Sequence, residues 1–151
     1  MKISTKAFKH LETIPTKYTA DGENINPELQ ITNIPKNTKT LTLICDDPDA
    51  KKICGFTWIH WLIFNIPTNK EKIVIQENSI PGKSGDSSYH KDSYGGPNPP
   101  AGTGIHNYHF KIYALDTELN LQKNASLEEI NNAMQNHILD NCEIIGTYQR
   151  K

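Results

Sequence analysis

The segment Trp58–Ile66 reads WIHWLIFNI, and its pattern decides which class of fold the chain can adopt. It is apolar at nearly every position, on both of the faces that an extended chain presents. On such a chain His60 shares one face with Leu62 and Phe64, whereas Trp61 lies on the other. Apolar runs of this kind are typical of a strand that is covered on both sides, so we expect a central strand here.

Two further segments have the composition and alternation of strands. They are Thr40–Cys45 (TLTLIC) and His106–Leu115 (HNYHFKIYAL), and in the second His106 and Tyr108 share one face. Between the predicted strands, Ser79–Gly104 is the longest irregular stretch and is rich in Gly, Pro, Ser and Asp. Loops of this length are uncommon in small domains and are usually functional or disordered.

One helix is expected near the end of the chain. Ser126 is a good N-cap, and Glu129 three residues later completes a capping box. Apolar residues then recur at helical spacing as far as Ile138, which predicts a helix over about 127–141. A final short strand, Glu143–Tyr148 (EIIGTY), is expected to follow.

Many strands and one late helix predict a mainly β fold of antiparallel strands. The chain has 151 residues and a mass of 17.1 kDa, which suits a single domain spanning residues 1–151. It is long enough to bury a core without a disulfide or a metal. Lys plus Arg (16) and Asp plus Glu (17) nearly balance, with a net charge of −1. We therefore do not expect a general nucleic-acid binder.

The termini and cysteines predict a cytoplasmic protein. Residues 1–10 (MKISTKAFKH) contain no apolar stretch long enough for a signal peptide, and the run Trp58–Phe64 is too short to insert stably in a membrane. Cys45, Cys54 and Cys142 show no metal-binding spacing, so we expect reduced thiols. A disulfide between Cys45 and Cys54 is the alternative.

Three carboxylates follow the first predicted strand in the sequence Asp46-Asp47-Pro48-Asp49. Because they repel one another, at least one should have a cationic or hydrogen-bonding partner. The simpler interpretation is a solvated turn, since Asp and Pro both favour turns.

His60 and the segment Tyr94–Tyr108 (YGGPNPPAGTGIHNY) are the other two polar features. A buried imidazole must be hydrogen-bonded, and a satisfied core histidine is the simpler interpretation of His60. The glycines of the segment permit positive φ and its prolines stiffen it, which suits a loop that presents backbone N–H groups in fixed directions. The alternative is a structural turn leading into a core strand. Together, the three features indicate a small pocket with donors suited to phosphate or a similar anion.

Four segments resemble the phosphatidylethanolamine-binding protein (PEBP) family, in particular its short prokaryotic branch, described as Raf kinase inhibitor-like. The resemblance covers nearly the whole chain, in the expected order and spacing. The segments are DDPDA (Asp46–Ala50), IHWLIFNIP (Ile59–Pro67), YGGPNPPAGTGIHNYHFKIYALD (Tyr94–Asp116) and NHILDNCEIIGTY (Asn136–Tyr148).

The resemblance implies a sandwich of antiparallel sheets with a C-terminal helix, and a pocket for phosphate, acetate or phosphorylethanolamine-like groups. For this branch it also implies a homodimer, and we expect no cofactor. By the same resemblance, the ligand-binding residues are two carboxylates, a strand histidine, two loop backbone donors and a final His/Tyr pair: Asp47, Asp49, His60, Gly96, Asn98, His106 and Tyr108.

Three positions depart from the family pattern. Lys51 stands where the family usually has Pro, which adds a cation near the pocket. Asn98 replaces a common Cys, a change that is tolerable if the donor is the backbone N–H. Asn107 replaces an Arg, and we expect it to cost a structural ion pair because it lies on the opposite face of its strand from His106.

Three functions compete at this stage. The first is a non-catalytic protein that binds a small phosphorylated or carboxylate anion. The second is a protein that recognises a phosphoprotein such as a kinase. The third is a hydrolase, metal-dependent or metal-free, in which Asp47, Asp49, His60 and His106 form the site. Against the hydrolase, the sequence has no H-E-x-x-H or G-x-S-x-G motif.

Overall fold

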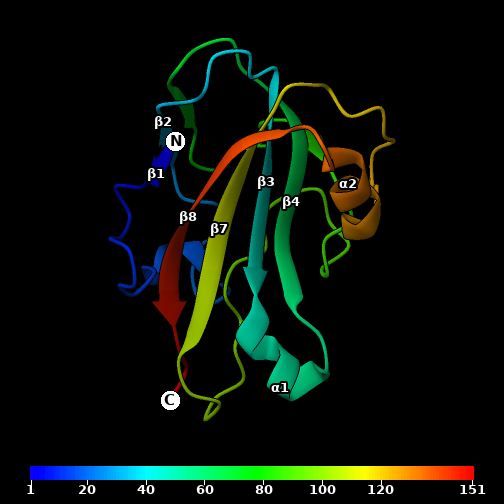
Figure 1. The fold of residues 1–151 in the computed structure, drawn as a ribbon. Helices are drawn as coiled ribbons and strands as arrows, with labels where there is room; N and C mark the ends of the chain where they lie inside the picture. Colours follow the sequence, from blue (N-terminus) through cyan, green and yellow to red (C-terminus); the bar gives the residue numbers. More distant parts are fainter.

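In the computed structural model, which describes residues Met1–Lys151, two antiparallel sheets pack face to face (Figure 1). The smaller sheet has the strand order β1 (Lys2–Ser4), β2 (Leu29–Thr32), β5 (Ile73–Ile75). The larger sheet has the order β6 (Lys83–Ser84), β4 (Trp58–Pro67), β3 (Thr40–Asp47), β7 (His106–Leu115), β8 (Ile138–Tyr148). The predicted mainly β, antiparallel fold is confirmed.

The larger sheet is apolar on both faces, as the pattern of Trp58–Ile66 predicts. One face packs on the smaller sheet and forms the inter-sheet core, which includes Leu43, Trp61 and Phe110. The other face is covered by helix α2 (Leu127–Met134) and the chain leading to it, and forms the helix-side core, with Leu62 and Ile130. In Figure 1, α2 lies against the face of the larger sheet near β4.

Helix α2 begins as predicted but ends seven residues earlier than the expected Asn141. Ser126 and Glu129 form the complete capping box. Gln135 then leaves the helical region (ψ 134°), and Asn136 adopts a left-handed φ of 66°. The apolar residues that continue the helical spacing belong instead to β8, where Ile138 pairs with Leu115. Strand pairing therefore overrides the helical pattern, and the last strand is 11 residues long rather than short.

A second helix was not predicted. After β3, a 3₁₀ turn (Pro48–Ala50) leads into α1 (Lys51–Cys54), which Gly55 ends at a left-handed φ of 90°. Ser79–Gly104 is irregular except for the short β6, as expected. In Figure 1, α1, the loop before β7 and the C-terminus lie at the same end of the molecule. The three cysteines are free, so the Cys45–Cys54 disulfide is not formed.

The contact between α2 and the larger sheet gives the first prediction. Ile130 is fully buried, so Ile130→Ala leaves a cavity and should lower the free energy of unfolding by about 2–5 kcal/mol. Ile105 is 58% exposed, and Ile105→Ala should change the free energy of unfolding by less than about 0.5 kcal/mol. Urea unfolding of the two variants checks this, and equal effects would contradict the assigned burial.

Candidate functional site

A bulge in β4 places His60 on the side of the sheet that faces the site. Cys45 pairs with Trp61, but the next residue of β3, Asp46, pairs with Ile59, so His60 is an extra residue in the ladder. Bulges of this kind redirect side chains and are common beside active sites. The prediction that His60 shares a face with Leu62 and Phe64 is therefore wrong. Those two residues join the helix-side core, whereas the His60 ring lies 5.1 Å from the ring of Tyr108, which belongs to the inter-sheet core.

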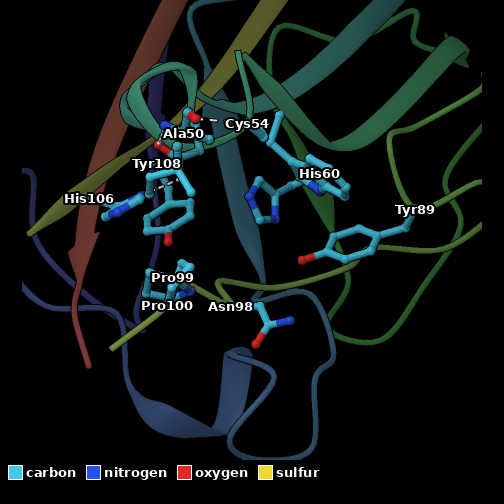
Figure 2. Close-up of a pocket in the computed structure, with 12 residues that line it drawn as sticks. Ala50, Cys54, His60, Tyr89, Asn98, Pro99, Pro100, His106 and Tyr108 are labelled. Carbon is cyan, nitrogen blue, oxygen red and sulfur yellow. Dashed lines mark hydrogen bonds and ion pairs between the residues drawn. The ribbon is translucent and has the colours of Figure 1, made fainter. Parts of the chain in front are cut away.

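Beside this bulge, at the α1 end of the molecule, is a cavity of about 200 Å³ (Figure 2). Figure 2 shows the His60 ring between the rings of Tyr108 and Tyr89, pointing into the cavity. The walls come from β3, the 3₁₀ turn, α1, β4, β7 and the long irregular stretch, and the lining residues are Asp47, Ala50, Ile53, Cys54, Trp58, His60, Tyr89, Asn98, Pro99, Pro100, His106 and Tyr108.

Asp47 links three of these elements through one buried carboxylate. It is the N-cap of the 3₁₀ turn, where Oδ1 accepts a hydrogen bond from the Ala50 N–H (3.2 Å). Its Oδ2 accepts from Nδ1 of His106 on β7 (2.7 Å). Both side chains are almost fully buried, so breaking this pair would leave an unpaired polar group in the protein. Asp47 is therefore structural as well as part of the cavity wall.

His106 has little freedom to contact a ligand through its ring nitrogens. Nδ1 faces Asp47, and Nε2 lies 3.0 Å from Oγ1 of Thr103. The Thr103 hydroxyl in turn donates to the carbonyl of Pro100 (2.7 Å). The ring is thus fixed between β3 and the loop that forms the opposite wall.

His60 and Tyr108 keep polar atoms without partners. Nδ1 of His60 donates to the Gly95 carbonyl (2.6 Å), which leaves Nε2 with no hydrogen bond. Burial lowers the pKa of His60 and outweighs the effect of the Gly95 carbonyl, which raises it. The Tyr108 hydroxyl is buried with no partner, and burial together with Asp47 raises its pKa well above the usual value. One free acceptor and one free hydroxyl therefore belong to the cavity wall, as does the unpartnered indole N–H of Trp58.

Arg150 fixes the loop wall from outside the cavity. Its guanidinium contacts both carboxylate oxygens of Asp21, and Nη1 donates to the Pro99 carbonyl (3.2 Å). Tyr148 also donates to Asp21 (2.7 Å), and the two donors lower the pKa of that carboxyl. The backbone N–H of Gly102 donates to the Arg150 carbonyl (3.1 Å). The end of the chain is thereby attached to the loop at two points.

Five of the seven predicted site residues line the cavity: Asp47, His60, Asn98, His106 and Tyr108. Asp49 and Gly96 do not. Oδ2 of Asp49 accepts from the backbone and side-chain N–H groups of Asn107, and the N–H of Gly96 donates to Oδ1 of Asn24. The Gly96 donor is therefore already used within the protein.

The departures from the family pattern lie mostly outside the cavity. Asn107 cannot form an ion pair, and its neutral amide instead donates to Asp49 (3.0 Å). Burial raises the pKa of Asp49, but the two hydrogen bonds from Asn107 outweigh this and lower it. Lys51 is not among the lining residues, whereas Asn98 is.

Several lining residues were not predicted to belong to the site, among them Trp58, Tyr89 and Cys54. Tyr89 comes from the long irregular stretch, where a lone aromatic residue among polar ones was the only available signal. Cys54 and its neighbour Ile53 reach the cavity through α1, a helix that was not predicted. No local pattern identified them.

The comparisons with known proteins agree with this architecture. The family model described as Phosphatidylethanolamine-binding protein matches residues 4–149. The chain belongs to this family. A UPF0098 protein of Methanothermobacter thermautotrophicus is 43% identical over 99% of both chains, and one of Pyrococcus abyssi is 43% identical over all of this chain and 86% of its own. A crystal structure of a PEBP homologue from Chlamydia trachomatis has a TM-score of 0.89 at 30% identity, covering 99% of this chain and 97% of the homologue.

The positions of the His, Cys, Asp and Glu side chains test the hypothesis of a metal-dependent hydrolase. No three His, Cys, Asp or Glu side chains are grouped so that they could hold a metal ion. Of the four proposed ligands, Asp49 is directed to Asn107 and Asp47 to His106. The structure therefore provides no set of metal ligands for that alternative.

The helices of the structure were also compared with the length and hydropathy of a membrane span, and none is long and apolar enough to cross a bilayer.

The contacts of Arg150 predict a positioning role. Arg150→Ala should speed amide hydrogen exchange at Gly102 about two- to fivefold, because a partly exposed ion pair contributes up to about 1 kcal/mol. Arg150→Lys should give an intermediate exchange rate, since it keeps the positive charge but loses the planar guanidinium that contacts both oxygens of Asp21. Lys151→Ala is the control. Unchanged exchange in Arg150→Ala would show that the loop is held without it.

Proposed function

We propose that this protein is a non-catalytic binding protein whose cavity takes one small anionic group of the phosphate or carboxylate type. The observation that carries this proposal is the Tyr108 hydroxyl, which is buried in the cavity wall without a partner. A buried donor left unsatisfied costs roughly 1–3 kcal/mol. A ligand oxygen that accepts from this hydroxyl would remove that cost.

The size of the cavity supports a small ligand. Pockets for drug-sized molecules usually measure about 300–1,000 Å³, whereas this one is about 200 Å³. Aromatic and proline side chains form much of the wall, and His60 and Tyr108 contribute polar groups to it. This arrangement suits a compact headgroup better than an extended chain.

A phosphorylated side chain carries the same group as a free phosphate ester. A phosphoprotein, such as a kinase, is therefore a candidate source of the ligand, and binding in the cavity would be one way to modulate it. This extension rests on the chemistry of the group, because fold alone does not determine a partner.

The direct test is an NMR titration of the histidine ring signals with O-phosphorylethanolamine. We expect saturable shifts at His60 and His106 and none at the remote His109. Tyr108→Phe should weaken binding about tenfold or more, because a hydrogen bond to a charged group is lost. Tyr113→Phe, on the opposite face of β7, is the matched control.

Two results would change the proposal. If no phosphorylated compound shifts either ring, the cavity does not bind this class of anion. If the titrated ester is converted to inorganic phosphate in the presence of the wild type but not of His106→Ala, the hydrolase alternative is favoured instead.

A further inference from the structure

The cavity has an unusual charge for a site that receives an anion. No Lys or Arg lines it, and its one carboxylate, Asp47, is buried in the wall. The Arg150 guanidinium is paired with Asp21 and reaches only the outer Pro99 carbonyl. A bare anion would therefore meet no Lys or Arg side chain in the cavity, and the buried carboxylate and His106 already pair with each other.

We propose that the cavity binds its anion together with one proton, held between a ligand oxygen and Nε2 of His60, and that the ligand class is a phosphate monoester rather than a diester. This inference rests on the proposed function and narrows it. It makes His60 the group that couples binding to pH.

The groups around His60 leave no other position for this proton. Asp47 at the end of β3 and His106 on β7 are committed to each other. Tyr108 on β7 and Tyr89 in the long loop present their ring edges or faces at 5.1 and 5.5 Å.

Both phenols remain protonated, because burial raises their pKa values, that of Tyr89 to about 12. Cys54 on α1 donates to the backbone carbonyls of Ala50 and Phe56. None of these groups supplies a cation.

The hydrogen bonds of His60 fix which nitrogen takes the proton. Nδ1 is used by the Gly95 carbonyl, so the tautomer that keeps this bond has its lone pair on Nε2, in the cavity. A deprotonated ligand oxygen would meet that lone pair, which is repulsive. One added proton turns the contact into a charge-assisted hydrogen bond, while Tyr108 donates to a second ligand oxygen.

A phosphate monoester can bring the proton itself. Its second pKa is about 6, so a fraction of it carries an O–H near neutral pH. A diester has no such oxygen, and the proton would have to reside on His60, whose burial disfavours the charged form. A free phosphate ester is a monoester and can carry this proton, whereas the phosphate of a lipid headgroup is a diester and cannot.

The test is calorimetry of the intact protein with O-phosphorylethanolamine, a monoester, and glycerophosphorylethanolamine, a diester with the same amine. Titrations at pH 7.0 and 8.0, in two buffers of different ionisation enthalpy, give the number of protons taken up. We expect uptake of about one proton by the monoester complex and affinity that falls about tenfold per pH unit. The diester should bind at least about tenfold more weakly at pH 7.0.

The His60→Gln variant tests whether His60 is the group that shares the proton taken up on binding. The Gln amide can donate to a deprotonated oxygen, so proton uptake and the pH dependence should disappear in this variant. If it fails to fold, the ¹⁵N shift of His60 Nε2 in the wild type should move away from its free lone-pair value when the monoester binds, because the nitrogen then shares the proton with a ligand oxygen.

Three results would overturn the inference. Wild-type binding without proton uptake, or uptake that persists in His60→Gln, would overturn the proton coupling and leave the proposed function intact. Equal affinity for the diester would overturn the ligand class. Binding of neither compound would overturn this inference and the proposed function together.

Discussion

The bulge at His60 in β4 is the constraint on which the site depends. Without the extra residue at His60, strict alternation would direct this imidazole into the apolar helix-side core with Leu62. With it, His60 and Trp61 face the same side, and the sheet keeps Trp61 in the inter-sheet core while the imidazole reaches the cavity. The two apolar cores hold the strand in this register, because a slip of one residue would move each side chain of β4 from one core to the other.

The Asp47–His106 pair is the second constraint, and it explains why the cavity is both rigid and short of positive charge. A buried carboxylate needs a partner, and His106 supplies it at 2.7 Å. The same pair joins β3 to β7, while Thr103 connects the ring to the proline loop. His106, which could have attracted an anion, is thus used to build the walls, and the atoms left without partners belong to His60, Tyr108 and Trp58.

Much of this architecture could be predicted because it depends on local pattern. The limits of β7 are those that the HNYHFKIYAL run indicates, and the capping box of α2 starts where Ser126 does. The predictions are wrong where the local structure depends on pairing with a residue that is distant in the sequence. The pairing of Ile138 with Leu115 ends the helix early, and the bulge depends on the register between β3 and β4. Similarly, Asp49 supports Asn107 rather than lining the cavity, which no spacing within its own segment reveals.

Membership of the family establishes the fold and leaves the chemistry to particular side chains, since one fold can serve different functions. What separates this cavity from a generic cationic anion site is the kind of donor it offers. A Lys or Arg would attract any anion in proportion to its charge. A buried imidazole base beside a buried carboxylate instead favours an anion that can still carry a proton, so selectivity arises from ionisation rather than from net charge. The low dielectric of the aromatic walls strengthens that discrimination, because it penalises each uncompensated charge.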